Sequence, residues 1–353
     1  MKIHGQDHDR RSLARHAGDL AAAGGVRLVE LQDGVERGIR VLEFRSGSGL
    51  AFDVLVDRAM DIGAAEHGGV GFGWQSPTGF RNPGLHEYRD EDGLSWLRSF
   101  SGLIVTAGMD HTLFTAEGDA SNYHYPPKAT TWNGLHGRVA NIPARLLGYG
   151  EEWREDGTCV LWCEGEVRQA AVFGEHLRLR RRIECDLGGD EIRLHDTVTN
   201  HGSDVTPHMF LYHINLGWPF LEEGVRVEAP IARTLWQTDS VGEQGSDHLV
   251  MDPPTPRFVE QVLEHELTPG PDGRAQVRAV NDRLGMTVEL DVDLQAFPAF
   301  FEWMHLREGG YALGLEPSTH HVAGEQAARD DGSMIWLQAG ESRSYATAMR
   351  VHR

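Results

Sequence analysis

Apolar and polar side chains alternate along much of the chain, most clearly in residues 176–186 and 191–200. In the first stretch, Leu177, Leu179 and Ile183 alternate with charged residues. A period of two residues is typical of β-strands that bury one face, so both stretches are predicted to be strands. Their charged positions, several of them arginines, are expected to form a solvated sheet face and not a binding patch.

Further strands are predicted where short runs of β-branched and aromatic residues lie between turn signals. These runs cover residues 26–31, 39–44, 50–56, 101–108, 160–167, 205–216, 258–266, 275–280, 286–292, 299–306, 311–315, 333–337 and 342–351. Asp33-Gly34 is one of the turns, and it predicts a hairpin. Residues 11–23 have a short helical pattern, and no long amphipathic helix is predicted after residue 24. The sequence therefore predicts an all-β fold, a large antiparallel β-sandwich.

No change in composition marks a domain boundary. We expect residues 1–24 to form an N-terminal arm and residues 25–353 to form a single β-sandwich domain. Residues 64–135 and 220–257 are predicted to be mostly loops, and the first stretch carries many Gly, Pro, Asn and Asp residues. Long ordered loops in a compact enzyme usually serve function, so we expect the first of these stretches to contribute to a site.

The composition excludes several classes of partner. The formal net charge is −20, whereas nucleic acids and anionic membrane surfaces attract clustered Lys and Arg. No apolar run approaches the ~20 residues that a membrane span needs. An apolar segment does not follow Arg10-Arg11, so no secretory signal is expected. We therefore expect neither nucleic acid nor a membrane as partner. The sequence does not determine the oligomeric state, and a homodimer is compatible with it.

The chain has three cysteines, which suggests reduced thiols and a cytoplasmic location more than a disulfide framework. The spacing of Cys159 and Cys163 is compatible with a metal site. Both residues lie in a predicted strand, however, where buried thiols are ordinary, and we expect no metal there.

Nucleotide and serine-hydrolase chemistry find little support. The sequence has no P-loop and no HExxH motif, and its glycine-rich stretches lack the strand–glycine–helix context of a dinucleotide site. Histidine and carboxylate chemistry remains. No organic cofactor and no metal are implied by these residues.

Three histidine- and carboxylate-bearing segments are candidates for a site. Glu316 is followed by Pro317, which favours an extended backbone near a strand end. His213 and Asn215 share one face of a largely apolar strand, and His136 lies in a glycine-flanked turn. Each has a plain structural alternative: a turn cap for Glu316, a hydrogen-bonded core network for His213, and an ordinary turn for His136.

Other polar residues favour structural interpretations. His320 and His321 are adjacent, so on an extended chain they point in opposite directions and a shared metal is not expected. We expect a solvated loop for both. Arg58 and Asp61 are interpreted as an ion pair that closes the first sheet, and Arg81 as a surface residue, with ligand binding as the alternative for all three.

Four segments together resemble the galactose mutarotase-like, or aldose 1-epimerase, superfamily. They are residues 57–63 (DRAMDIG), 135–137 (LHG), 212–217 (YHINLG) and 314–317 (GLEP), in this order. The chain is similar in particular to a bacterial branch that has carried only a domain-of-unknown-function label. The order and spacing are more specific for the fold than for the activity.

The resemblance implies a β-sandwich fold and cofactor-independent aldose 1-epimerase activity, which interconverts the α and β anomers of a monosaccharide. It implies that Glu316 is the general base for the anomeric hydroxyl. His213 would be the general acid at the ring oxygen, and His136 would hold the sugar near that oxygen. His213 lies closer to the following Asn-Leu element than the corresponding histidine of well-studied mutarotases, which leaves His208 as an alternative.

The resemblance also suggests residues that bind the sugar. Asp110 or Glu260 would hold hydroxyls, and Arg58, Arg81 or Arg138 would bind an anionic group on an acidic or modified sugar. Gly137-Arg138 is similar to the turn of the hexose-6-phosphate epimerase branch. Trp74, Trp132 and Trp303 would stack on a sugar face, with burial as the alternative for each. Asp61 and Asn215 complete the expected substrate-binding set.

Two other functions stay open on this fold. One is a carbohydrate lyase or isomerase that uses the same His and Glu for carbon-acid chemistry. The other is a carbohydrate-binding protein without catalytic activity. Carbon-bound proton exchange distinguishes the first from mutarotation, and sugar binding that survives loss of Glu316 would indicate the second.

Overall fold

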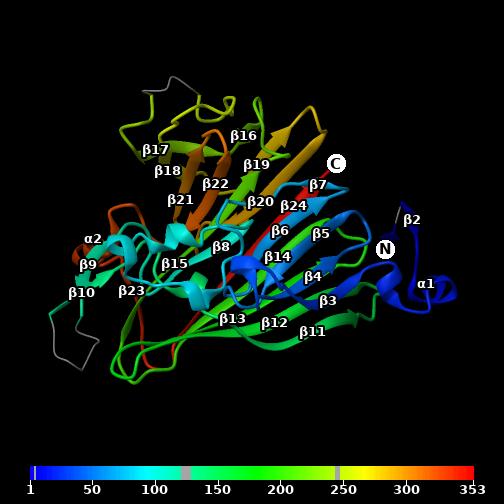
Figure 1. Ribbon diagram of the computed structural model, residues 1–353, viewed down its shortest axis with the longest axis horizontal. Coiled ribbons are helices and arrows are strands. Elements are labelled where there is room, and N and C mark those ends of the chain that lie inside the picture. Colours follow the sequence, from blue (N-terminus) through cyan, green and yellow to red (C-terminus); the bar gives the residue numbers. More distant parts are fainter. Residues whose placement is uncertain (4, 121–128, 243–246) are drawn as a thin grey trace.

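The computed structural model describes residues 1–3, 5–120, 129–242 and 247–353. Two large antiparallel sheets pack face to face, with long loops at one end (Figure 1). This arrangement confirms the predicted all-β sandwich. Parts of the two predicted loop stretches, residues 121–128 and 243–246, lie outside the described residues.

One sheet has eight strands. Their order across the sheet is β11 (Arg145–Trp153), β12 (Cys159–Ala170), β13 (His176–Asp186), β14 (Glu191–Asn200), β24 (Ser342–His352), β20 (Met286–Asp293), β19 (Arg274–Asn281) and β16 (Arg226–Glu228). The predicted strands at residues 176–186 and 191–200 coincide with β13 and β14.

The other sheet has twelve strands and carries the site described below. Ten of them run in the order β17 (Ile231–Gln237), β18 (Gln261–Leu267), β21 (Ala299–His305), β22 (Ala312–Ser318), β15 (Thr206–Gly217), β8 (Ile104–Met109), β6 (Asp61–His67), β5 (Leu50–Leu55), β4 (Arg40–Arg45) and β3 (Gly25–Glu30). The other two strands lie off this path: β7 (Val70–Gly71) pairs with β6, and β23 (Ile335–Leu337) pairs with β15. The hairpin predicted at Asp33-Gly34 is confirmed by the pairing of β3 with β4.

The remaining elements are short. They are β1 (Lys2–Ile3), β2 (Gln6–Asp7), β9 (Ala116–Asp119), β10 (Thr130–Asn133), α1 (Arg10–His16), α2 (Gly324–Asp331) and the 3-10 turns Leu20–Ala22, Gly34–Glu36, Pro83–Leu85, Asp90–Gly93, Ser95–Arg98 and Val139–Asn141. Neither helix in the described part of the chain has the length and apolar character needed to cross a membrane.

The two sheets enclose one large apolar core, and an ion-pair network crosses it. Arg181 of β13 is fully buried between Asp196 of β14, at 2.6 Å, and Asp61 of β6, at 2.9 Å. Tyr212 of β15 donates a hydrogen bond of 2.6 Å to Asp196. Because Asp61 and Tyr212 belong to the twelve-stranded sheet, this network ties the two sheets together inside the core.

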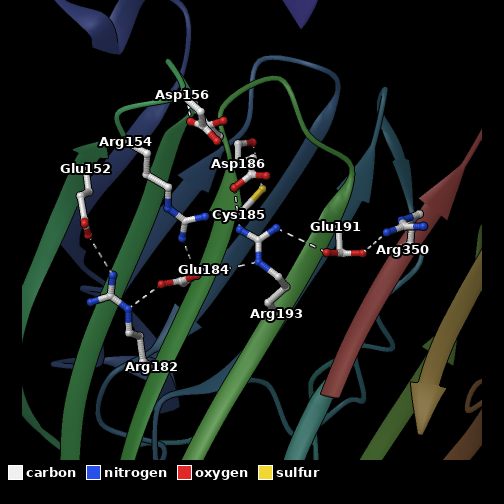
Figure 2. A network of polar contacts seen from close by, with 11 residues as sticks. Glu152, Arg154, Asp156, Arg182, Glu184, Cys185, Asp186, Glu191, Arg193 and Arg350 are labelled. Atoms are coloured by element: carbon white, nitrogen blue, oxygen red, sulfur yellow. Dashed lines mark hydrogen bonds and ion pairs between the residues drawn. The ribbon is translucent and has the colours of Figure 1, made fainter. Parts of the chain in front are cut away.

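The outer face of the eight-stranded sheet is charged, as expected, and its charges are paired. Arg182 lies between Glu152 and Glu184, and Arg193 lies between Glu184 and Glu191 (Figure 2). Arg182–Glu152 and Arg193–Glu184 join different strands, whereas Arg182–Glu184 lies within β13 and Arg193–Glu191 within β14. The arginines are engaged by neighbouring carboxylates, which favours a structural role for this face over a binding patch.

Candidate active site

A cavity of about 270 Å³ lies against the twelve-stranded sheet, on the face turned away from the core. Its lining is mostly apolar and aromatic and consists of Leu94, Trp96, Leu97, Phe100, Leu113, Phe114, Leu135, His136, His213, Glu260, Val262, Phe301, Trp303, Glu316 and Val322. Strands β15, β18, β21 and β22 form its floor, and residues 94–100, 113–114 and 135–136 contribute to its walls.

The sheet register brings Glu316 and His213 together. Ile214 of β15 pairs with Leu315 of β22, so His213 and Glu316 lie on the neighbouring positions of adjacent strands. Side chains alternate between the faces of a sheet, so both point away from the core-facing Ile214 and Leu315. His213 Nε2 lies 3.1 Å from Glu316 Oε1, but the two atoms are not aligned for a hydrogen bond.

His136 reaches the same cavity from a tight turn. Its φ is +55°, and that of Gly137 is +72°. The turn is held by hydrogen bonds from His136 N to Leu113 O and from Gly108 N to His136 O. A Cβ at Gly137 would stand 2.5 Å from His111 O, so only glycine fits there. The His136 and His213 ring centroids are 5.5 Å apart.

Four buried polar atoms of the cavity lining have no hydrogen-bond partner among the described residues. They are Trp96 Nε1, His136 Nδ1, His213 Nδ1 and Glu316 Oε1. Leaving a buried donor or acceptor unpaired costs roughly 1–3 kcal/mol, so such groups are rare unless a ligand or water completes them. Their convergence in one cavity indicates a binding site for a polar molecule.

A larger hollow of about 800 Å³ lies along β19 and the loop at residues 268–272. Its lining includes none of the unpartnered buried atoms found in the described part of the chain. We therefore choose the smaller cavity as the candidate site, because it contains the unpartnered buried atoms although the other hollow has the larger volume.

Burial dominates the electrostatics of the site. It lowers the pKa of His136 to about 3, with a smaller contribution from His111. It also holds the pKa of His213 well below its ordinary value, with the charge of His136 acting in the same direction. Burial raises the pKa of Glu316 well above its ordinary value, and the nearby charge of Glu260 adds to that rise. All three groups are thus driven towards their neutral forms.

Aromatic rings form the cavity walls. The Trp96 ring lies 4.5 Å from that of His136, and the Phe100 ring 4.6 Å from that of His213. Trp303 lies 5.3 Å from His213, and its Nε1 donates a 3.0 Å hydrogen bond to Glu260. Glu260, weighed above as a second carboxylate, is therefore at the cavity and fixes Trp303.

Several residues expected to bind sugar lie outside the cavity lining. Arg58 is buried and donates to the backbone oxygens of Arg81, Ser99 and Ala140. Asp61 forms its ion pair with Arg181 and accepts from Thr106. Arg81 donates to Leu85 O. Arg58 thus holds together three loops, at residues 81, 99 and 140, by hydrogen bonds to their backbones. Asp61 belongs to the ion-pair network in the core.

The other predicted binding residues divide between the turn and the sheet. The Arg138 guanidinium lies 3.6 Å above the Tyr88 ring, and Tyr88 Oη accepts from Gly134 N, so Arg138 supports the His136 turn. Asn215 Nδ2 donates to the backbone oxygens of Gly102 and His213. Trp132 is 42% exposed, and neither it nor Asp110 lines the cavity. Of the residues expected to bind the sugar, Trp303 and Glu260 line the cavity.

Three alternatives can be placed as well. His208 is fully buried between Met109 O and Tyr345 Oη, away from the cavity lining. Trp74 packs against Phe100 and Trp303 behind the lining. The expectation of a solvated loop was wrong for His320, which is 3% exposed. Its segment is held against β15 by the hydrogen bond from Thr319 N to Phe210 O, and its Nδ1 lies 2.8 Å from Thr319 Oγ1. His321 is half-exposed and pairs with Glu264.

The family model described as a domain of unknown function, DUF4432, matches residues 36–351. The chain belongs to this family. No curated protein matches the sequence. The family assignment agrees with the branch suggested by the motifs, and it carries no activity of its own.

Solved structures with the same fold come from the mutarotase-like group. A candidate aldose 1-epimerase from Klebsiella pneumoniae subsp. pneumoniae MGH 78578 has a TM-score of 0.81 at 23% identity, over 92% of this chain and 83% of that one. A galactose mutarotase-like protein from Clostridium acetobutylicum has a TM-score of 0.62 at 11% identity, over 93% and 98%. Galactose 1-epimerase from Lactobacillus acidophilus NCFM has a TM-score of 0.56 at 10% identity, over 93% and 98%. At these identities the likeness establishes the fold, which is the galactose mutarotase-like β-sandwich.

Proposed function

We propose that the protein is an aldose 1-epimerase that interconverts the anomers of a neutral monosaccharide. The observation that carries this proposal is the convergence of His136, His213 and Glu316 in one cavity, each with an unpartnered buried atom. The names of the structural neighbours agree with this activity but do not establish it for this chain.

Mutarotation needs two proton transfers on opposite sides of a hemiacetal. One proton leaves the anomeric hydroxyl, one arrives at the ring oxygen, and the ring opens to the aldehyde. The aldehyde group then rotates about the bond to its neighbouring carbon. The ring hydroxyl attacks the other face of the carbonyl, which closes the ring as the other anomer. We assign the first transfer to Glu316 and the second to His213. His136 holds the sugar near the ring oxygen. Each positioned acid or base contributes about 10²–10⁴-fold to such a reaction.

In the resting state, the pair His213–Glu316 shares one proton, which is the number that the reaction needs. Burial favours the neutral forms of both groups, so the proton of the pair rests on Glu316. Once the two side chains align for a hydrogen bond, transfer of that proton to His213 produces a carboxylate base and an imidazolium acid without any change in net charge. The pair therefore titrates as a unit, and substrate hydroxyls stabilise its charged form by donating to Glu316.

The lining favours a neutral sugar over the acidic one that the sequence had left open. None of the described residues that line the cavity is Lys or Arg, and two of them, Glu260 and Glu316, are carboxylates. A phosphate, sulfonate or carboxylate in this cavity would lack a cationic partner and would meet like charge. Aromatic walls match the C–H faces of a sugar ring, and the unpartnered N–H and carboxylate atoms match its hydroxyls.

The test is saturation transfer between anomeric protons, measured by NMR over a panel of neutral, phosphorylated and uronic sugars. We expect the wild type to accelerate the exchange between the anomers of a neutral aldose. In Glu316→Gln the catalysed exchange rate should fall by roughly 10²–10⁴-fold. Glu289→Gln, which changes a buried carboxylate of the eight-stranded sheet, is the matched control.

No acceleration with any sugar would overturn the proposal. Incorporation of deuterium at a sugar carbon in heavy water would instead indicate the lyase or isomerase alternative. Sugar binding of equal strength in wild type and Glu316→Gln, without turnover in either, would indicate a binding protein.

A further inference from the structure

A second cluster of histidine and carboxylate side chains lies on the other face of the same sheet. We propose that His248, His265 and Glu302 bind one divalent transition-metal ion of the Zn²⁺ class. The site is separate from the candidate active site, and none of its three residues lines that cavity.

The three side chains converge closely enough to share one ion. His248 Nδ1 lies 2.9 Å and His265 Nε2 lies 3.2 Å from Glu302 Oε2, and one ligand atom from each residue falls within 4.8 Å of the others. Zn–N and Zn–O bonds of about 2.0–2.2 Å place tetrahedral ligands roughly 3.3–3.6 Å apart. Small side-chain movements therefore suffice for an ion to enter.

The chemistry of the donor set fits a transition metal. Two imidazoles and one carboxylate form a borderline N/O set, which suits Zn²⁺ and its first-row neighbours more than Mg²⁺ or Ca²⁺. Three protein ligands would leave a fourth position for water. The side chain of His248 is 26% exposed, so the cluster is open to solvent at that residue.

Hydrogen bonding inside the cluster is incomplete without a cation. Both histidines meet the same carboxylate oxygen, Oε2, whereas Glu302 Oε1 is buried and has no partner among the described residues. Glu302 is 1% exposed, so water does not readily reach that oxygen. A bound cation would neutralise the buried carboxylate and satisfy it.

The surroundings fix the two histidines in the orientation that a ligand needs. His265 Nδ1 lies 3.1 Å from Thr234 Oγ1 of β17, which leaves Nε2 for the metal. Metal-binding histidines commonly use the second ring nitrogen in this way. His248 stands in a segment that is tied to the chain around β16 by hydrogen bonds from Val227 N to Leu249 O and from Met251 N to Val225 O.

The position in the fold indicates a structural role. Glu302 lies between Phe301 and Trp303 of β21, two residues of the cavity floor, and alternation turns it to the opposite, core-facing side. An ion held there would join β18, β21 and the segment of His248. It would stiffen the strand beneath the cavity without touching the sugar.

Metal binding to the full-length protein tests this proposal directly. The chain is treated with a chelator, and CoCl₂ is titrated while the visible absorption of tetrahedral Co²⁺ is followed. We expect saturation at about one ion per chain, and displacement of the signal by ZnCl₂, because tetrahedral three-ligand sites accept both ions. His248→Ala and Glu302→Gln should each abolish the absorption band.

Two further variants make the test specific. Thr234→Val should retain the band but weaken Co²⁺ binding by roughly 10–100-fold, since it removes the group that orients His265. His321→Ala is the matched control, because His321 pairs with the buried carboxylate of Glu264 but no third ligand joins them among the residues that the structure describes. It should bind Co²⁺ like the wild type.

The absence of saturable Co²⁺ or Zn²⁺ binding in the wild type would overturn the proposal. Equal binding in the wild type and His248→Ala would do so too, by placing the ion elsewhere. His248 is partly exposed, so His248→Ala decides the outcome even if Glu302→Gln fails to fold.

Discussion

Gly314 of β22 lies directly opposite Trp303 of β21, and the missing side chain leaves the space that Glu316 and Trp303 share. A Cβ built on Gly314 would stand 2.8 Å from Glu316 Oε1 and 3.0 Å from Trp303 Cβ. The glycine in the GLEP segment is thus a requirement of the candidate active site and not of a turn.

Gly314→Ala should therefore reduce activity more than stability. The Trp303 Cβ is fixed by the strand, whereas the Glu316 carboxylate ends a flexible side chain and will move. Overpacking of this kind costs about 1–3 kcal/mol, and misplacing a catalytic group by ~1 Å can cost on the order of 10²-fold in rate. Anomer exchange and urea unfolding measure the two effects. Gly18→Ala, where a Cβ meets nothing within 4 Å, should change neither.

Glu260→Gln should move the acidic limb of the pH–rate profile to lower pH. The charge of Glu260 contributes to the raised pKa of Glu316, so its removal weakens the hold of the His213–Glu316 pair on protons. The second proton, which inactivates the pair, is then gained only in more acid solution. A glutamine oxygen can still accept from Trp303 Nε1, which preserves the wall of the cavity. Rates of anomer exchange between pH 4 and 9 check this. An unmoved limb, or the same movement in the exposed control Glu266→Gln, would contradict it.

His136→Asn should flatten the acid side of the stability profile. The folded-state pKa of His136 is lowered to about 3, from 6.5 when unfolded, so the unfolded chain binds more protons between these values. The stabilisation is complete above pH 6.5 and is lost as the pH falls towards 3. A shift of this size corresponds to at most ~5 kcal/mol. Asparagine tolerates the positive φ of residue 136.

Urea unfolding at pH 7.0, 5.5 and 4.5 gives the comparison for His136. The wild type should lose more unfolding free energy over this range than His136→Asn. Parallel losses in the two proteins would mean that His136 accepts a proton without unfolding.

Arg181→Met should destabilise the fold by about 3–5 kcal/mol, because it leaves Asp61 and Asp196 buried without a counter-charge. Arg180→Met, on the next position of the same strand, removes an exposed pair with Glu164 and should cost at most ~1 kcal/mol. The midpoints of urea unfolding at pH 7 measure both. Equal losses in the two variants would refute the role of the core network.

The strands that sequence predicts best are those with one buried face. β13 and β14 have alternating burial, and their bounds follow from the pattern. β17 was not predicted, since it is an edge strand with mostly exposed side chains and has no alternation to detect. Much of β11 is exposed in the same way.

The candidate site was predictable where chemistry marks the residue. His136, His213 and Glu316 stand out by type and by motif, and the structure brings all three to one cavity. Trp96 and Phe100 were not singled out, because they lie in an aperiodic loop and reach the cavity only through tertiary contacts. The prediction that residues 64–135 form functional loops was the one signal for them.

The motif around Arg58 and Asp61 shows where prediction from the sequence fails. Sequence identifies the polar residues but does not tell whether they face a ligand or the core. That depends on Arg181, which is remote in sequence and pairs with Asp61 only once both sheets have formed. The same holds for Arg58, whose partners are three backbone oxygens of distant loops.

The burial of Cys159, Cys163 and Cys185 has a practical consequence for fluorescence experiments. These three are the only cysteines of the chain, and all are buried and free. Burial raises the pKa of Cys159 to about 11 and that of the other two thiols as well, so reactive thiolate is scarce. A cysteine placed at exposed Leu97, on the rim of the cavity, would therefore be the preferred target for a maleimide dye. Such a dye could report sugar binding in the native protein without any further mutation.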